Sequence, residues 1–387
     1  MSRFATRRLA PLVALLLHAC DPGPEPPLAA ETVEEREVAP GVVHRYLWSA
    51  AGPWAVHIVE AAPGSCRPVV RTWKAGGALV GRAPTSALAR EAEAALGRPV
   101  LAAVNADFFS FDPPGVPTGA QVADGEVVRG PGTRPVFGVD VDGTPFIATV
   151  ELDAEVHTSA GMSARVRRIN TRPGPDEITL YNRFTGGTTP ADTGVVEAII
   201  APQEGLPGSG HGVVSAFDTA PAGVPVPDGG VVLAGRGRGA AFLQHLLEPG
   251  DTVRWEVAFD GAPGPVREMV GGYPALLRDG DALETTGDFA TTRHPRTAVG
   301  WRRDGTLLLV VADGRQDGYS VGMSLPELTD LLRSLGAVDA LNLDGGGSTT
   351  LVVRGEVVNR PSDPQGERPV ANALLLLASD SARCPVR

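Results

Sequence analysis

The sequence predicts an α+β protein with a mixed, largely antiparallel β-sheet core and a few covering helices. Short apolar runs end repeatedly at Gly or Pro, as strands do, and two longer segments carry helix start and stop signals. Strands lie before and after each helical segment, which indicates a sheet layered by helices. The 387 residues include 48 Gly and 35 Pro with 43% hydrophobic residues, a composition typical of a turn-rich globular protein.

The first third of the chain contains four predicted strands and one helix. Runs 42–49, 54–61 and 69–73 alternate or are apolar throughout. Segment 85–96 is rich in Ala, Glu and Arg and stops at Gly97, which predicts a helix. Run 99–104 then predicts a buried strand that leads into the polar stretch 105–109.

The middle third, about 120–290, continues the pattern of strands and turns without a clear sequence repeat. Asp-Gly pairs at 142–143, 260–261 and 279–280 are typical of hairpin turns. We divide the chain into a β-rich segment with one helix over 41–98 and a main domain over 99–380.

The last third has the clearest pattern. Runs 297–301 and 306–311 flank Asp304-Gly305 and predict a hairpin. A helix follows, because Ser324 and Glu327 form a capping-box pattern around Pro326 and a row of leucines ends at Gly336. Run 338–343 predicts a buried strand, and 348–353 with 356–358 predicts another hairpin.

The N-terminus has the three-part layout of an export signal over residues 1–20. A basic start precedes the apolar run 9–17, and Cys20 follows the small residue Ala19, as in a bacterial lipobox. We expect Cys20 to carry a lipid that anchors the protein in the periplasm or on the cell surface. The alternative is ordinary signal-peptidase cleavage and secretion. Residues 21–40 are Pro-rich and acidic, which is typical of a tether.

Charge and cysteine content narrow the classes of protein. A net charge of −11 argues against non-specific nucleic-acid binding, which needs a dense basic face. If Cys20 is lipidated, Cys66 and Cys384 are the two remaining cysteines. Because exported proteins meet an oxidising environment, these two cysteines can form a disulfide. The alternative is a pair of buried free thiols.

The stretch Asn342–Leu351, NLDGGGSTTL, is the most unusual in the chain. Three adjacent glycines indicate close approach of another group to the backbone. A P-loop needs a Lys that is absent here, and a dinucleotide-binding turn needs a following helix. The loop therefore predicts a site for an anion or a sugar ring, and a sharp turn is the alternative.

Five other polar clusters lie at predicted strand ends. Between them they contain carboxylate, amide and guanidinium groups, and each alone is typical of a turn. Together they predict one shared polar pocket. The clusters are Asn105 to Phe109, His294 to Thr297, Asp313 to Arg315, Asn359 to Asp363 and Glu367 to Asn372.

These motifs resemble those of the phosphodiester glycosidase family. The resemblance rests on AAVNADFF, HPRTAVG, VVADGR, the block VGMSLPELTDLLRSLGAVDALNLDGGGSTTLVV and NRPSD…GERPVANALLL, spans about 100–378, and is densest over 294–378. It implies hydrolysis of a sugar-1-phosphodiester at the C1–O bond, in a secreted or lipid-anchored bacterial protein.

The resemblance implies roles that suit the residue types. The oxocarbenium-like state of the sugar requires a carboxylate as nucleophile or as base for water. The candidates are Asp344, Asp107 and Asp313, and we expect Asp344 near the anomeric carbon. The guanidinium groups of the arginine candidates can bind the phosphate through paired hydrogen bonds. The alternative is that these arginines form structural ion pairs. Amides can hold sugar hydroxyls, and their alternative is turn formation. The substrate-binding candidates are Asn105, Arg296, Arg315, Gly345, Gly346, Gly347, Ser348, Asn359, Arg368 and Asn372.

No cofactor is expected. Ca²⁺ remains an option because Asp-rich strand ends suit it, whereas no His or Cys cluster indicates zinc. The expected partner is a phosphate-linked glycan of the cell envelope or an extracellular glycan, with membrane contact through a lipid anchor only. The alternatives are a non-catalytic surface binder of anionic glycans and an enzyme that processes exopolysaccharide. The G-x-S-x-G elbow of Ser-His-Asp hydrolases is absent.

Overall fold

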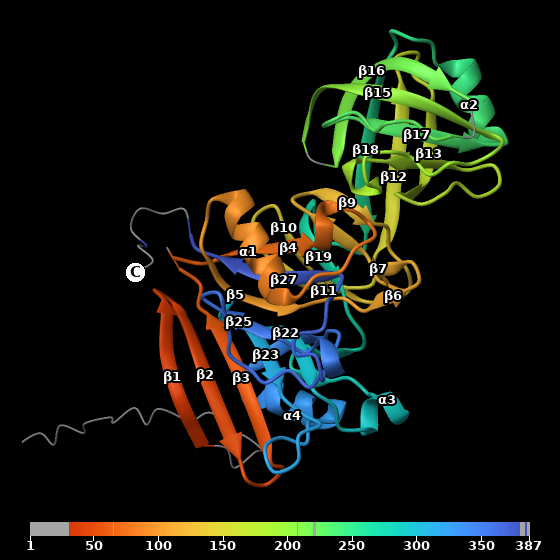
Figure 1. Ribbon diagram of the computed structural model, residues 1–387. Coiled ribbons are helices and arrows are strands. Elements are labelled where there is room, and N and C mark those ends of the chain that lie inside the picture. Colours follow the sequence, from red (N-terminus) through yellow and green to blue (C-terminus); the bar gives the residue numbers. More distant parts are fainter. Residues whose placement is uncertain (1–30, 65, 207, 220–221, 380–383, 385–387) are drawn as a thin grey trace, which may run out of the picture.

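A computed structural model describes residues 31–379, except 65, 207, 220 and 221, and also residue 384 (Figure 1). The expected α+β class is wrong: 48% of the described residues are strand and 13% helix, and the strands form several sheets and a seven-stranded barrel. The physical reason lies in the middle third, whose strands close on one another in a barrel instead of extending one helix-covered sheet.

Two antiparallel sheets pack face to face and form a sandwich. Apolar side chains of both sheets share one core, which includes Val59, Leu309 and Leu341 from one sheet and Val104 and Leu374 from the other. The eight-stranded sheet has the order β1 (Glu31–Ala39), β2 (Val42–Ser49), β3 (Trp54–Ala61), β23 (Leu307–Ala312), β22 (Arg296–Arg302), β24 (Ala337–Asn342), β20 (Ala275–Arg278) and β21 (Asp281–Ala282). The five-stranded sheet has the order β26 (Glu356–Val357), β25 (Leu351–Val353), β5 (Val100–Asn105), β27 (Asn372–Leu377) and β4 (Val69–Lys74).

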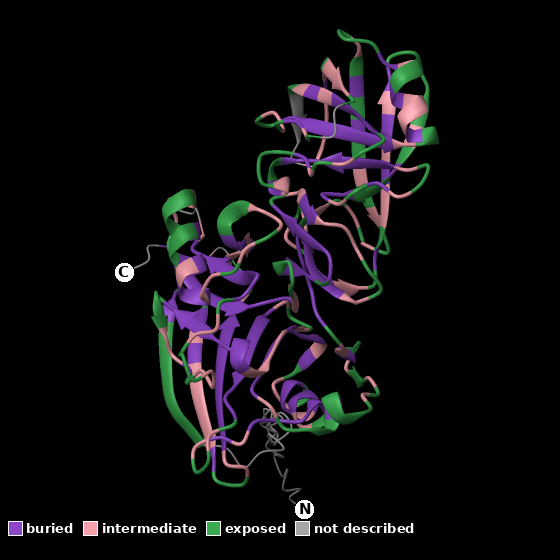
Figure 2. Ribbon diagram, turned by 45° about the vertical axis from the view of Figure 1, so that its right-hand side comes forward, coloured by how far each residue is buried: buried purple, intermediate pink, exposed green. Residues whose placement is uncertain are grey.

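Each sheet of the sandwich carries one helix on its other face. Helix α1 (Thr85–Leu96) packs Leu88 and Ala92 against the five-stranded sheet. Helix α4 (Leu325–Ser334) packs Leu328 and Leu332 against the eight-stranded sheet. The predicted capping box starts α4, because the Ser324 hydroxyl accepts from the Glu327 N–H and the Glu327 carboxylate accepts from the Ser324 N–H. Figure 2 shows the buried strands between these layers.

The middle third forms a smaller sheet and a barrel, which projects from the sandwich (Figure 1). The smaller sheet has the order β11 (Pro145–Ala148), β10 (Val136–Asp140), β19 (Val266–Gly271), β8 (Gln121–Ala123) and β9 (Glu126–Arg129). The barrel has the order β12 (Glu151–Thr158), β13 (Ser163–Ile169), β14 (Ile178–Tyr181), β17 (Val231–Arg236), β15 (Val195–Leu206), β16 (Ser209–Asp218) and β18 (Thr252–Asp260). The remaining elements are η1 (Ala75–Gly77), β6 (Phe109–Phe111), β7 (Pro114–Pro117), η2 (Arg183–Thr185), α2 (Arg238–Leu246), α3 (Asp288–Thr291) and η3 (Gly346–Ser348).

Most predicted elements outside the barrel are confirmed with boundaries within one or two residues. The N-terminal segment is not separate from the rest, because β3 pairs with β23 and β4 pairs with β27. Strand β1 occupies residues 31–39, inside the stretch for which the composition indicated a tether. The export signal and Cys20 lie outside the described residues. None of the described helices is both long and apolar enough to cross a membrane.

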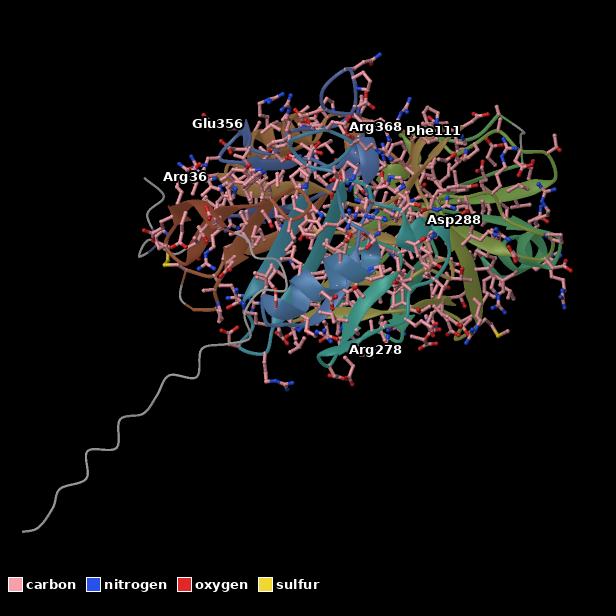
Figure 3. The ribbon with its side chains drawn as sticks, turned by 90° about the horizontal axis from the view of Figure 1, so that it is seen from below. Arg36, Phe111, Arg278, Asp288, Glu356 and Arg368 are labelled. Atoms are coloured by element: carbon pink, nitrogen blue, oxygen red, sulfur yellow. A yellow bond between two sulfur atoms is a disulfide. The ribbon has the colours of Figure 1, made fainter. Side chains whose placement is uncertain are left out.

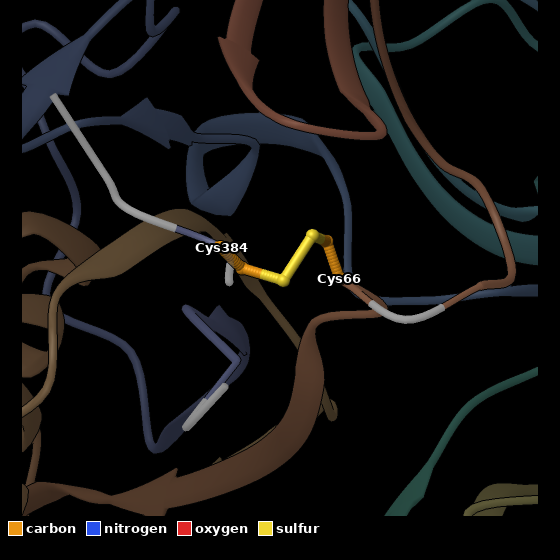
Figure 4. The surroundings of a disulfide bond; sticks show 2 residues. All are labelled: Cys66 and Cys384. Atoms are coloured by element: carbon orange, nitrogen blue, oxygen red, sulfur yellow. A yellow bond between two sulfur atoms is a disulfide. The ribbon is translucent and has the colours of Figure 1, made fainter. Parts of the chain in front are cut away.

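A disulfide joins Cys66, which precedes β4, to Cys384 near the C-terminus (Figure 4). The sequence left open whether the two cysteines are free thiols or form a disulfide, and the structure contains the disulfide. The two cysteines are 318 residues apart, so the bond closes almost the whole described chain into one loop. Such a cross-link stabilises mainly by reducing the entropy of the unfolded chain.

We therefore expect Cys66→Ser to lower the free energy of unfolding by about 2–5 kcal/mol. Urea denaturation with and without a reductant measures the effect. Cys384→Ser and the double variant should lose the same amount, because each removes the same bond. An unchanged unfolding midpoint in all three variants would show that the bond does not contribute to stability.

Candidate active site

Two carboxyl groups lie where one strand of each sandwich sheet ends. Asp107 follows β5 of the five-stranded sheet, and Asp344 follows β24 of the eight-stranded sheet. The backbone N–H of Asp344 donates to the carbonyl of Ala106 over 2.8 Å, so the two strand ends are joined directly. The site is therefore positioned by both sheets of the sandwich.

Buried asparagines complete this junction. Asn105 donates to the Asp344 carbonyl over 2.6 Å and accepts from the Thr297 hydroxyl at 2.8 Å and the Thr350 N–H at 3.1 Å. Asn372 accepts from the Asp107 N–H and donates to Gln121, both at 2.9 Å. Their amide groups are used within the protein, so in this structure they frame the site rather than face it.

Asp107 is fully buried against two glycines. Its Oδ2 accepts from the Gly119 N–H at 2.7 Å, and a Cβ on Gly119 or Gly271 would lie 3.1 or 2.7 Å from that oxygen. Burial raises the pKa of Asp107 to about 7, and the charge of Asp344 adds to the shift, while the Gly119 N–H and the charge of Arg134 oppose it. Near neutral pH this carboxyl holds its proton part of the time.

Asp344 is partly exposed and accepts from the Gly345 N–H at 2.9 Å. Burial raises the pKa of Asp344 to about 6, and the charges of Arg368 and Arg134 oppose the shift. Asp344 is therefore the carboxyl of the pair that a ligand can touch. Two neighbouring carboxyls whose pKa values are both raised by burial are typical of an acid–base site.

The three glycines after Asp344 leave room for three different groups. A Cβ on Gly345 would lie 2.7 Å from the Pro295 carbonyl oxygen, and one on Gly346 would lie 3.0 Å from Nη2 of Arg315. On Gly347 it would lie 2.2 Å from Nη2 of Arg368. Two guanidinium groups thus lie against the loop, where a side chain would displace them. Ser348 is buried beneath the same loop.

The guanidinium groups at the loop give it a positive charge. Arg315 is exposed, and its Nη2 lies 3.2 Å from Nδ1 of His294. Burial, with the charges of Arg315 and Arg296, lowers the pKa of His294, so this imidazole is neutral at pH 7 and accepts from Arg315. Arg368 pairs with Asp363 at 2.9 Å, whereas Arg315 makes no ion pair with any residue that the structure describes. An anion therefore finds an uncompensated guanidinium beside the glycine backbone.

Arg296 has a different role from the phosphate contact that the sequence predicted. Its side chain is 2% exposed, and it donates to the carbonyls of Met323, Phe289 and Thr292 over 2.8–2.9 Å. Burial and the charge of Arg315 lower the pKa of Arg296 to about 10. The guanidinium group thus holds α3 in place. Its positive charge is not neutralised by an ion pair with any residue that the structure describes.

Asp313 is likewise buried and saturated with hydrogen bonds. It accepts from Asn359 Nδ2 at 2.8 Å, the Arg360 N–H at 2.9 Å and the Tyr319 hydroxyl at 3.0 Å. Burial raises the pKa of Asp313 to about 6. Asn359 in turn accepts from the Leu351 N–H at 2.7 Å, so both residues support the strand that leaves the glycine loop. Among the described residues, neither makes a hydrogen bond to Asp107 or Asp344.

The sequence did not single out Arg134 and Phe289, which lie on the Asp107 side of the pair. Arg134 donates to the exposed Thr118 hydroxyl at 3.1 Å and stacks on Phe108, while Tyr273 and Phe289 lie next to it. Arg134 lies two residues before β10, a strand-end signal like the others, but its cluster has no carboxylate or amide. Figure 3 labels Phe111 at the end of β6, Asp288 at the start of α3 and Arg368.

The described residues contain no group of three or more His, Cys, Asp or Glu side chains that could hold a metal ion. Asp107 and Asp344 are the two carboxyls at the site, and they would be the ligands of any Ca²⁺ there.

Comparisons with known proteins agree with the motif pattern. Residues 208–377 match the model of the phosphodiester glycosidase family, and the expected resemblance is confirmed. The mouse N-acetylglucosamine-1-phosphodiester alpha-N-acetylglucosaminidase is 36% identical over 114 residues, which are 26% of this chain and 22% of the mouse protein. The chain therefore spans about a fifth of that relative.

Two solved structures are similar over most of the chain. A hypothetical protein from Synechocystis covers 91% of this chain, which covers 64% of it, with a TM-score of 0.70 and 23% identity. A Burkholderia pseudomallei protein described as exported covers 84% of this chain, which covers 74% of it, with a TM-score of 0.63 and 27% identity. The first likeness shows a shared fold.

The buried carboxyl of Asp107 predicts a pH-dependent cost to stability. Its folded-state pKa of about 7 lies above the unfolded value, so its contribution is most favourable below about pH 4 and is lost as pH rises through 7. Asp107→Asn removes this loss and should be more stable than the parent by about 2–4 kcal/mol above pH 7.5.

Urea denaturation at pH 4 and pH 8 measures this difference. Asp142→Asn, in the exposed β10–β11 turn, controls for the change of net charge. A stability gain of Asp107→Asn that is equal at both pH values would contradict a raised pKa.

Proposed function

We propose that the protein hydrolyses a sugar-1-phosphodiester at the C1–O bond and releases a free sugar and a phosphate monoester of the acceptor. The observation that carries the proposal is the partly exposed Asp344 carboxyl between a buried carboxyl and a glycine loop lined by guanidinium groups. The match of residues 208–377 to the phosphodiester glycosidase family supports it.

The leaving group explains the arginines. A phosphate monoester leaves readily, so its departure requires compensation of charge more than protonation by an acid. Arg315 and Arg368 lie against Gly346 and Gly347, where their guanidinium N–H groups would meet the phosphate oxygens. In this assignment the phosphate lies over the glycine loop.

The sugar side requires a carboxylate. As the C1–O bond breaks, its electron pair leaves with the phosphate and positive charge develops at C1 and the ring oxygen. Ionised Asp344 stabilises this charge, either by forming an ester with C1 that water then hydrolyses or by taking the proton of an attacking water. Asp107 lies behind it, and its partial protonation keeps the pair from carrying two full negative charges beside an anionic substrate.

The compartment is also a proposal. The Cys66–Cys384 disulfide suits an oxidising environment, and the similar Burkholderia protein is described as exported. We propose export to the cell envelope, with Cys20 as the lipid-anchor residue and a phosphate-linked glycan as substrate.

Release of free sugar from UDP-N-acetylglucosamine and a panel of hexose-1-phosphodiesters tests the activity, using the protein without residues 1–30. We expect Asp344→Asn to lower kcat by at least about a thousandfold, because the developing charge at C1 loses its carboxylate. Asp142→Asn, in the exposed β10–β11 turn, is the control for loss of a carboxylate elsewhere in the protein. No release from any diester would refute the proposal, and binding of these diesters without turnover would favour a glycan-binding role.

The pH dependence follows from the carboxyl pair. Activity requires ionised Asp344, so the rate should rise with pH through about 6, and it should fall above about 7 as Asp107 ionises. Asp107→Asn should keep the rise near pH 6 and lose the fall above 7. Initial rates between pH 4 and 9 measure both limbs. A fall above pH 7 that persists in Asp107→Asn would assign it to another group.

A further inference from the structure

We propose that Phe108, Tyr273, Phe289 and Arg134 form the sugar subsite of this centre, a surface that we call the aromatic wall. The inference rests on the proposed function, and it assigns the two sides of the carboxyl pair to the two parts of the substrate. The sugar ring lies on the Asp107 side, against the wall. The phosphate lies on the Asp344 side, over the glycine loop.

The wall is a continuous set of ring contacts. The ring centroids of Phe108 and Phe289 are 6.2 Å apart, and those of Tyr273 and Phe289 are 6.3 Å apart. The Arg134 guanidinium carbon lies 5.0 Å from the centre of the Phe108 ring and 5.6 Å from that of Tyr273. Tyr273 is 48% exposed and Phe289 42% exposed, so the rings are open to a ligand.

Each part of the wall is held by buried groups. Arg296 donates to the carbonyls of Phe289 and Thr292, which fixes the α3 turn. The Asn342 side-chain N–H donates to the backbone carbonyl of Tyr273 at 2.7 Å. The backbone carbonyl of Asn342 accepts from the Tyr273 N–H at 2.8 Å. Phe108 is the residue after Asp107. Exposed rings on a fixed framework lose little conformational entropy when a ligand stacks on them.

The contacts of Arg134 and Arg368 relate the aromatic wall and the glycine loop to the two carboxyl groups. The charge of Arg134 acts on both Asp107 and Asp344, and Arg134 is linked to Asp107 through Thr118, whose hydroxyl lies 3.4 Å from Asp107 Oδ1. The charge of Arg368 acts on Asp344 from the glycine loop. Arg134 is thus linked to Asp107 through Thr118, whereas Arg368 lies against Gly347 in the loop that follows Asp344. If the phosphate takes the loop, the sugar on the other side of C1 meets the wall.

The chemistry of the wall suits a pyranose. A pyranose has an apolar C–H face that packs on aromatic rings and a rim of oxygen atoms that accept hydrogen bonds. Arg134 supplies donors at that rim, and it makes no ion pair with a carboxylate among the described residues. Thr118 adds an exposed hydroxyl next to Asp107. We therefore assign a neutral hexopyranose or N-acylhexosamine ring to the wall.

The test separates sugar binding from phosphate binding. Isothermal titration or ligand-observed NMR measures the affinity for N-acetylglucosamine, mannose and inorganic phosphate in the parent, Phe289→Ala, Tyr273→Ala and Arg315→Gln. We expect the two wall variants to bind the preferred sugar about tenfold more weakly with unchanged phosphate affinity. Arg315→Gln should show the reverse. Phe111→Ala is the matched control, because Phe111 is an aromatic residue 69% exposed outside the wall.

The outcomes distinguish this inference from the proposed function. Wall variants that lose sugar affinity support it even when no phosphodiester is hydrolysed, in which case only the proposed activity fails. If the wall variants keep sugar affinity and lose phosphate affinity, the two sides are reversed and the inference is overturned. It is also overturned if the parent binds neither sugar, or if Phe111→Ala weakens sugar binding as much as Phe289→Ala. With an active protein, the wall variants should raise KM more than they lower kcat.

Discussion

The site depends on one backbone hydrogen bond, from the Asp344 N–H to the carbonyl of Ala106. It joins the ends of β24 and β5, which belong to different sheets of the sandwich. Asn105 reinforces the same junction through Asp344, Thr297 and Thr350. Because both sheets share one apolar core, the positions of the two carboxyls are set by the packing of the whole sandwich.

This arrangement explains features that are unfavourable by themselves. A buried Asp107 with a raised pKa lowers stability near neutral pH, and three glycines increase the entropy lost on folding. Both are needed where they occur: Gly119 and Gly271 admit the Asp107 carboxyl, and the glycine loop admits the guanidinium groups of Arg315 and Arg368. Local stability is reduced where the charges of a reactive centre must lie close together.

The sequence predicted most strands of the sandwich, α1, α4 and the polar clusters at strand ends, because periodicity, caps and turn residues act locally. It did not predict β1, which lies where the composition indicated a tether. It could not predict the barrel, since closure depends on which strands pair across the chain, and the middle third has no repeat. It also could not separate framework from site: Asn105, Arg296 and Asp313 have the residue types of a site, but burial and saturated hydrogen bonds are tertiary properties. The sequence did not indicate the aromatic wall as one surface, because its rings come from three separate segments, after β5, after β19 and in α3.

Identifying the bond that breaks tests the proposed mechanism most directly. A carboxylate at C1 and guanidinium groups around the phosphate require cleavage between C1 and oxygen, with water adding to the sugar. Hydrolysis in ¹⁸O-labelled water, followed by mass spectrometry of the products before mutarotation exchanges the label, distinguishes the two bonds. The account predicts ¹⁸O in the released sugar and none in the phosphate monoester. Label in the phosphate would mean attack at phosphorus and would contradict the role given to Asp344.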